Sequence, residues 1–181
     1  IFTQPAHLKA YALIACLMFA GFSVIPFISP YMVANGGLTE VDLKYIYLCG
    51  GAATFFTARL IGKLADKIGK PRVFTALAIL SLPAILALTH WRPAPLSLTL
   101  MASTLFMVVV SGRFIPAMAM VTSSVLPQHR GSFMGFNSAI QSLCSGLAAL
   151  MSGTLIHRSP EGHLLGYDHV GYIACAFTLA C

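Results

Sequence analysis

Acidic residues are scarce in this sequence, with only 5 Asp and Glu among 181 residues, and Lys and Arg add 11 further charges. Charged residues make up 9% of the chain, whereas an ordinary soluble domain carries about a quarter. Hydrophobic residues make up 57%, which is more apolar surface than a soluble fold can bury. The composition therefore argues against a soluble domain and indicates an integral membrane protein.

Nucleic-acid binding is not expected either, although the net charge is +6. In a soluble protein such a charge would suggest a nucleic-acid partner. Here the basic residues lie in short segments between apolar runs, where they are better explained by the charge asymmetry of a membrane protein. Membrane lipids are the partner that this distribution predicts.

Cysteine and histidine spacings that would indicate metal or redox chemistry are also missing. The five cysteines are odd in number, form no CxxC and lie in apolar runs, so we interpret them as small buried hydrophobes. His157, His163 and His169 are evenly spaced, but no acid or cysteine completes a zinc set, and a solvated loop is the favoured interpretation. HExxH, GxSxG and an intramembrane acid pair are absent. We therefore expect no metal site, no cofactor and no enzymatic activity.

Six apolar runs occupy most of the chain, and about 20 apolar residues suffice to cross a bilayer. We predict an all-α, polytopic membrane protein whose helices cover residues 11–33, 41–64, 73–89, 96–125, 132–156 and 169–181. Residues 10–181 would form the six-helix bundle, and residues 1–9 the end of a cytoplasmic linker. Because the sixth run is short and the chain starts without Met, we expect a piece of a longer protein.

Basic residues indicate the orientation of these predicted helices. If the N-terminus is cytoplasmic and the helices alternate, the cytoplasmic side receives seven Lys and Arg and the outer side three, with Arg113 inside a run. Cytoplasmic segments carry an excess of Lys and Arg, so this count favours a cytoplasmic N-terminus. Four of the five acids fall on the outer side, and only Asp66 falls inside.

The segment between the second and third runs is unusually rich in charge and reads G-K-L-A-D-K-I-G-K-P-R, residues 62–72. Gly62 and Gly69 permit a tight turn with positive φ. Asp66 is placed to accept hydrogen bonds from amides of the turn or from neighbouring cations. A turn with two glycines and one central acid is typical of a latch rather than of a plain spacer.

This segment resembles the signature loop of the major facilitator superfamily, G-x-L-a-D-r-x-G-r-[kr], which lies between the second and third helices of a six-helix half. Lys67 and Lys70 stand where that family usually has Arg, and Pro71 interrupts the basic pair. The turn L-P-Q-H-R-G before the fifth run is similar to the p-x-x-R-G turn of the same family. The resemblance implies a gating motif of Gly62, Leu64, Asp66, Lys67, Gly69, Lys70 and Arg72, and a cytoplasmic turn that contains Arg130 and Gly131.

The resemblance also implies a function, which is transport of a small solute by a secondary active carrier with alternating access. The fifth run contains G-L-A-A-L-M-S-G at residues 146–153 and lacks the Gly-Pro of the N-terminal half of antiporters in the family. The chain is therefore more similar to the C-terminal half, helices 7–12, with the last helix cut short. Its expected partners are the missing N-terminal six-helix half of the same polypeptide and a small-molecule substrate.

By overall pattern the chain resembles bacterial proton-driven efflux permeases of the sugar or drug type, which are antiporters of the cell inner membrane. No Asp or Glu lies inside an apolar run, and proton-driven transport usually works through intramembrane acids. We therefore expect the proton-carrying acid in the missing half. Two alternatives stay open: a complete small carrier that works as a homodimer of six-helix units, and a non-transporting membrane scaffold or receptor.

Polar residues within the runs are the candidates for a substrate or coupling cavity. Arg113 lies inside the fourth run, where a charge is costly and by default functional, although it could instead cap carbonyls freed by Pro116. Asn137 and Gln141 are one helical turn apart on the fifth run, and either bind a polar solute or hold helices together by hydrogen bonds. Small residues around them, such as Ser142, are expected to allow close helix packing.

Overall fold

The computed structural model describes residues 5–181, and it confirms the all-α fold class, with a single short β-hairpin added near the C-terminal end. The helices are α1 (Pro5–Phe22), α2 (Ile28–Ala34), α3 (Leu43–Ile68), α4 (Lys70–Thr89), α5 (Leu96–Gly112), α6 (Phe114–Ser123), α7 (Arg130–Leu155) and α8 (Tyr167–Ala180). Two 3-10 turns, η1 (Ile25–Phe27) and η2 (Pro127–His129), and the strands β1 (His157–Arg158) and β2 (Leu164–Leu165) complete the described elements.

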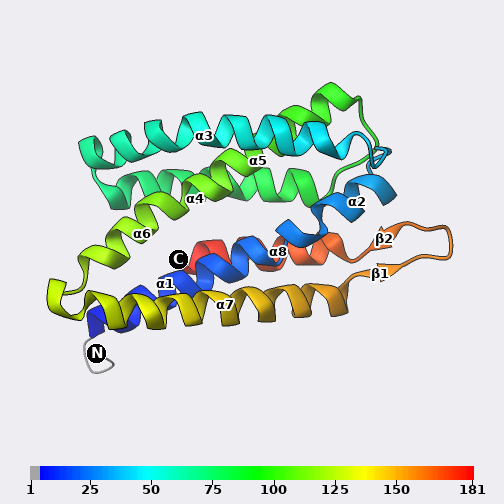
Figure 1. Ribbon diagram of the computed structural model, residues 1–181. Helices are drawn as coiled ribbons and strands as arrows, with labels where there is room; N and C mark the ends of the chain where they lie inside the picture. The colour runs from blue at the N-terminus through cyan, green and yellow to red at the C-terminus, as the bar shows by residue number, and fades with distance from the viewer. Residues whose placement is uncertain (1–4) are drawn as a thin grey trace.

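The long helices form two groups that run side by side (Figure 1). In one group α3 and α4 pack on α5, and in the other α7 and α8 pack on α1. The groups are joined where α8 lies on α4 and where α6 crosses towards α1 and α4. The N-terminus, the α3–α4 connection and η2 lie at one end of the bundle, and the β-hairpin lies at the other (Figure 1).

Helix length and apolarity single out three candidate membrane spans among the described residues, namely His7–Ala34, Lys70–Thr89 and Leu96–Ser123. The helices α3 and α7 have 26 residues each and so measure about 39 Å, enough to cross a hydrocarbon core of about 30 Å. They fall short in apolarity rather than in length. The sequence predicts six spans, and three of them meet the requirements of length and apolarity together.

Two of the predicted spans are interrupted, each four residues before a proline. The first run breaks where α1 ends at Phe22, before Pro26, and the fourth breaks where α5 ends at Gly112, before Pro116. Proline cannot donate to the carbonyl four residues earlier and its ring crowds that carbonyl, so a break there is expected. Pro83 nevertheless lies inside an uninterrupted α4, which shows that proline alone does not determine the break.

Several predicted boundaries and environments differ from the structure. The proposed linker is already helical from Pro5, while residues 1–4 lie outside the described part. The predicted solvated loop with three histidines is in part a β-hairpin, in which His157 pairs with Leu165. The cysteines are not buried as predicted: Cys49 is exposed and the other four are half-buried, because the helix faces that carry them are only partly covered by neighbouring helices.

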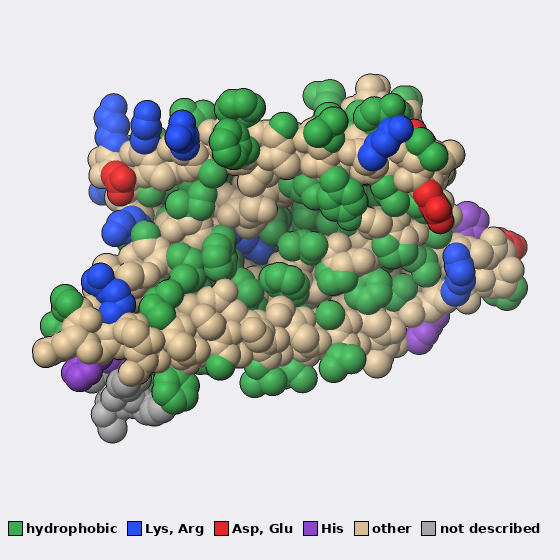
Figure 2. Space-filling model, viewed as in Figure 1, with side chains coloured by type: hydrophobic (Ala, Val, Ile, Leu, Met, Phe, Trp, Pro, Cys, Tyr) green, Lys and Arg blue, Asp and Glu red, His purple; other side chains and the backbone are tan. Residues whose placement is uncertain are grey.

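Charged side chains gather at the two ends of the bundle, as a membrane protein requires (Figure 2). The end that carries the N-terminus and the α3–α4 connection holds most of the Lys and Arg, with one acid among them (Figure 2). The middle of the visible face is covered by hydrophobic and neutral side chains, apart from a recessed basic side chain in the hollow between the two groups of helices. This distribution agrees with alternating helices whose basic connections share one side.

Candidate solute site and gating motif

A belt of polar side chains separates two apolar cores inside the bundle. The core towards the β-hairpin contains Ile85, Phe106 and Val170, and the core towards the N-terminus contains Phe74 and Phe133. Between them lie the buried polar side chains Ser81, Arg113 and Thr178, each no more than 4% exposed. The belt therefore lies within the bundle, away from both charged ends.

Arg113 stands at the junction of α5 and α6 and is 1% exposed. Its Nη1 atom donates hydrogen bonds to Oγ of Ser81 at 3.1 Å and to Oγ1 of Thr178 at 2.8 Å. These two hydroxyls in turn donate to carbonyl oxygens of their own helices, α4 and α8. Arg113 thus links the interrupted span to two other helices through neutral acceptors.

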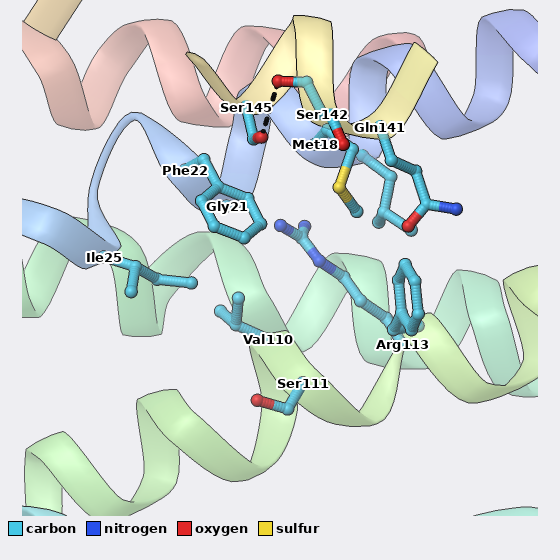
Figure 3. A pocket seen from close by; sticks show the side chains of 12 residues that line it. Met18, Gly21, Phe22, Ile25, Val110, Ser111, Arg113, Gln141, Ser142 and Ser145 are labelled. Carbon is cyan, nitrogen blue, oxygen red and sulfur yellow. Dashed lines mark hydrogen bonds between the residues drawn. The ribbon is translucent and has the colours of Figure 1, made fainter. Parts of the chain in front are cut away.

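The opposite edge of the Arg113 guanidinium is unused. Within the described residues, its Nε and Nη2 atoms are buried and have no hydrogen-bond partner. Figure 3 shows the guanidinium directed towards Gly21, Phe22 and Met18 of α1. Within residues 5–181 no backbone carbonyl, including the one that Pro116 frees, accepts a hydrogen bond from this guanidinium.

A pocket of about 460 Å³ lies in front of Arg113, between α1, the α5–α6 junction and α7. Among the described residues, Arg113 is the one charged residue that lines it, and Gln141, Ser142 and Ser145 contribute polar groups from α7 (Figure 3). The rest of the lining is largely apolar, with Phe22 at one side. A pocket of this volume, apolar with a few convergent polar groups, is typical of sites for small organic molecules.

Asn137 and Gln141, which the sequence predicts to act together, have different surroundings in the structure. Both side-chain amides point to Sδ of Met118 on α6 at 4.0 Å, a long and weak contact between helices. Gln141 also lines the pocket, whereas Asn137 is fully buried and does not. Gln141 is therefore brought together with Arg113, and Asn137 contributes to helix packing next to the site.

The residues of the predicted gating motif occupy a sharp helix–helix corner rather than a loop. The helix α3 continues to Ile68 and α4 begins at Lys70, so that Gly69 alone connects them, with φ of 101°. The expectation of positive φ at both glycines is therefore right for Gly69 and wrong for Gly62, which is helical. Gly62, Leu64, Asp66 and Lys67 lie on the last turns of α3, and Lys70 and Arg72 lie on the first turn of α4.

Asp66 is exposed at this corner and does not accept the hydrogen bonds that the sequence suggested. None of the hydrogen bonds or ion pairs found among residues 5–181 involves its carboxylate. The reason is geometric: the preceding helix continues through Asp66, so the turn amides are already paired within the helix or lie beyond its reach. Its carboxylate is free to meet a group outside this chain.

The second predicted turn is also shorter than expected. Pro127–His129 forms the 3-10 turn, and Arg130 and Gly131 are the first residues of α7 instead of turn residues. Arg130 and Lys70 line the same surface hollow, together with Met118 and Thr122 of α6. Two residues that the sequence assigned to separate connections therefore lie at one basic surface.

The sequence did not reveal the residues whose hydrogen bonds hold the interrupted helices and the β-hairpin in place. Tyr167 of α8 donates from its hydroxyl to the carbonyl of Val24, at the break of the first span, at 3.0 Å. The side chain of Asn35, after α2, donates from Nδ2 to the carbonyl of Leu164 (2.9 Å) and accepts at Oδ1 from the backbone N–H of Leu164 (2.8 Å). Ser81 and Thr178 were missed as well, since an isolated hydroxyl in an apolar run carries no distinctive signal.

These observations define a helical, multi-pass membrane protein with interrupted spans around an interior pocket. The sequence profile of the Major Facilitator Superfamily matches residues 11–181, nearly the whole chain. The chain therefore belongs to the Major Facilitator Superfamily, and transport of a small solute across a membrane is the function of that class. A search of curated protein sequences finds no match.

Proposed function

We propose that this chain is one half of a secondary active carrier and that the pocket in front of Arg113 is its share of the solute path. The observation that carries the proposal is the position of the pocket, next to the breaks of both interrupted spans. In secondary transporters, interrupted helices at the interface of two repeats commonly form the substrate site. The two halves would then rock around this site to expose it alternately to each side.

The partner in this proposal is an N-terminal six-helix half of the same polypeptide. Support comes from α7, where Ser138, Ser142 and Gly146 share one face and are exposed, although small residues normally serve close helix packing. An added Cβ at Gly146 would meet nothing within 4 Å in the described structure. This face therefore does not pack closely within the described chain, and we propose that it packs on the missing half. The helices of this chain would then be helices 7–12 of the whole carrier.

The gating motif would act as a latch on that half at the cytoplasmic side. Asp66 is the acid of the motif and lacks a partner in the described residues, while Lys63, Lys67 and Lys70 surround it on the same corner. A carboxylate at such a corner can accept hydrogen bonds from the start of a neighbouring helix. The carrier is proposed to lie in a bacterial inner membrane with a cytoplasmic N-terminus, so that this corner faces the cytoplasm.

Proton-coupled efflux of a sugar-like or drug-like solute is the finer form of the proposal. It is supported by the resemblance of the motifs to those of antiporters. The described helices place no acid at the pocket, so the proton-carrying acid is assigned to the other half. This chain would supply solute contacts and one side of the gate.

The test is solute efflux by the native protein in vesicles, with Asp66→Ala compared with Glu161→Ala. Glu161 is also an exposed acid, but it lies in the β-hairpin connection at the opposite end. A latch predicts that Asp66→Ala lowers the transport rate by about tenfold or more, as expected for the loss of a charge-assisted contact, while Glu161→Ala transports normally. Equal rates for both variants, at equal amounts in the membrane, would refute the latch.

The two alternatives predict different results in the same system. A homodimer of six-helix units predicts an intact native polypeptide scarcely longer than 181 residues, with two copies cross-linking through α7. A scaffold or receptor predicts no solute flux for the intact native protein under any gradient. The proposed half-carrier predicts a polypeptide of about twice this length, since such carriers pair two six-helix repeats.

A further inference from the structure

We propose that Arg113 binds an oxyanion group of the solute, so that the transported compound is a small organic anion with an apolar body. This inference rests on the proposed function as a carrier and adds the chemical class of its substrate. It follows from the unused edge of one buried guanidinium, from the position of the acids and from the lining of the pocket.

The unused edge has the geometry of a bidentate anion site. A guanidinium offers a pair of parallel N–H groups along the edge formed by Nε and Nη2, which matches the two oxygens of a carboxylate or a phosphate. In Arg113 these are the two atoms without a partner in the described residues. Ser81 and Thr178 occupy Nη1 instead, so that the edge of Nε and Nη2 is left without a partner and is buried in this conformation.

No carboxylate of the described residues neutralises this cation. The five acids are Glu40, Asp42, Asp66, Glu161 and Asp168, and the only ion pair found in residues 5–181 joins Asp168 to His169. The thiols of Cys175 and Cys181 lie within electrostatic reach of Arg113, but a free thiol titrates at about 8.5 and is mostly neutral at pH 7. A buried charge without a counter-ion is costly, and an anionic solute would offset that cost.

The remaining lining of the pocket fits the rest of such a solute. Leu17, Met18 and Phe22 supply apolar surface from α1, and Gln141 contributes an amide from α7. At about 460 Å³ the pocket holds a small organic molecule rather than a bare inorganic ion. An aromatic or aliphatic acid places its oxyanion on Arg113 and its apolar body against α1.

The test measures ligand binding to the full-length native protein, purified in a neutral detergent. The probes share one ring and differ in charge: benzoate, phenyl phosphate and benzenesulfonate as anions, benzamide as a neutral analogue and benzylamine as a cation. We expect at least one anion to bind about tenfold or more tightly than benzamide, which corresponds to about 1.4 kcal/mol or more. Added phosphatidylglycerol should not compete, because a lipid headgroup lies at the membrane surface.

Two substitutions separate charge from geometry. Arg113→Gln should abolish the preference for anions, and Arg113→Lys should retain the charge but weaken anion binding, because an ammonium lacks the fork of two parallel donors. Arg92→Gln is the control, since Arg92 is an exposed arginine outside the pocket, and it should bind like the unsubstituted protein. The comparison of probes on the unsubstituted protein stands even where an Arg113 variant does not fold.

Equal binding of anions and benzamide would overturn the inference, and would indicate that a carboxylate of the other half already occupies Arg113. Unchanged anion preference in Arg113→Gln would overturn it too. Failure of this inference can be distinguished from failure of the proposed function. Anion binding without any solute flux would refute the carrier and keep the anion site, whereas flux of a neutral solute without anion binding would keep the carrier and refute the anion site.

Discussion

The guanidinium of Arg113 and the hydroxyl of Thr178 lie 2.8 Å apart, and this contact joins the interruption between α5 and α6 to the last turn of α8. The hydroxyl of Thr178 donates its single proton to the carbonyl of Ala174, so it can only accept from Arg113. Arg113 is therefore held in one orientation by its neighbours before any solute arrives, and such pre-organisation favours binding.

Replacement of Thr178 by Val tests this contact, because Val has nearly the same shape and lacks the acceptor. Loss of a hydrogen bond to a buried charge should lower the free energy of unfolding by about 1.5–3 kcal/mol. Thr122→Val is the matched control: its hydroxyl also donates to the carbonyl four residues earlier, but it does not contact Arg113. The temperature of unfolding in detergent should fall for Thr178→Val and stay nearly constant for Thr122→Val; equal shifts would contradict the contact.

Gly166, which precedes α8, should not tolerate a side chain. Its φ of 88° disfavours other residues, and an added Cβ would overlap the carbonyl oxygen of Leu155. Gly162 has a similar φ of 91° but open space around it. Gly166→Ala should therefore destabilise the protein by more than the 1–2 kcal/mol that left-handed backbone costs an L-residue, while Gly162→Ala should show only that smaller loss. Thermal unfolding of the two variants side by side decides the matter.

The two glycines of the gating motif should respond in opposite directions. Gly69→Ala forces a side chain onto a residue with φ of 101° and ψ of 135°, a conformation used almost only by glycine, so the corner between α3 and α4 should lose about 1–3 kcal/mol. Gly62 is helical and an added Cβ meets nothing within 4 Å, so Gly62→Ala should leave stability unchanged or raise it by about 0.5–1 kcal/mol. If Gly62→Ala unfolds the protein while Gly69→Ala does not, the corner has been described incorrectly.

The double hydrogen bond between Asn35 and Leu164 should control the order of the β-hairpin. Asn35→Ala removes both partners of the Leu164 backbone, and the amide hydrogen of Leu164 should exchange faster with solvent as a result. Amides in the middle of α4, which has no contact with Asn35, serve as the internal reference. Unchanged exchange at Leu164 would show that the strand pairing alone holds the hairpin.

Oxidative cross-linking checks the packing of α8 against α1. Cys181, at the end of α8, points to the carbonyl of Leu13 at 3.9 Å, and Cys16 lies three residues further along α1. A mild oxidant should therefore join Cys16 to Cys181 within one molecule, and peptide mass spectrometry should detect the pair. Cys49 is exposed on α3 and should stay unpaired within the same molecule. Preferential pairing of Cys49 with Cys16 would contradict the arrangement of these helices.

The helices themselves could be predicted from the sequence, because apolar runs of about 20 residues leave few alternatives in a membrane. The interruptions were harder to predict. Pro26 and Pro116 break their helices and Pro83 does not, although all three lack the same donor. The difference lies in tertiary contacts such as that of Tyr167 with the carbonyl of Val24, which a single sequence does not reveal.

The candidate site could be predicted only in part, because tertiary contacts decide which polar residues meet. Arg113 and Gln141 stand out as polar residues in apolar surroundings, and the structure brings both to one pocket. Asn137 stands out equally and shares the face of Gln141 on α7, but it lies one turn earlier, where it is fully buried against α6 and does not line the pocket. Ser81 and Thr178 belong to the site only because they accept hydrogen bonds from Arg113. They lie 32 and 65 residues from it along the chain, respectively.

The central claim, alternating access to the pocket in front of Arg113, is tested most directly by labelling of Ser145→Cys in a cysteine-free variant of the native protein. Ser145 lines the pocket and is half-buried in this half. A membrane-impermeant maleimide would be applied to right-side-out and inside-out vesicles, with and without a transported solute. Alternating access predicts labelling from both sides, in proportions that shift in opposite directions when the solute is added. Labelling from one side only under every condition would contradict it.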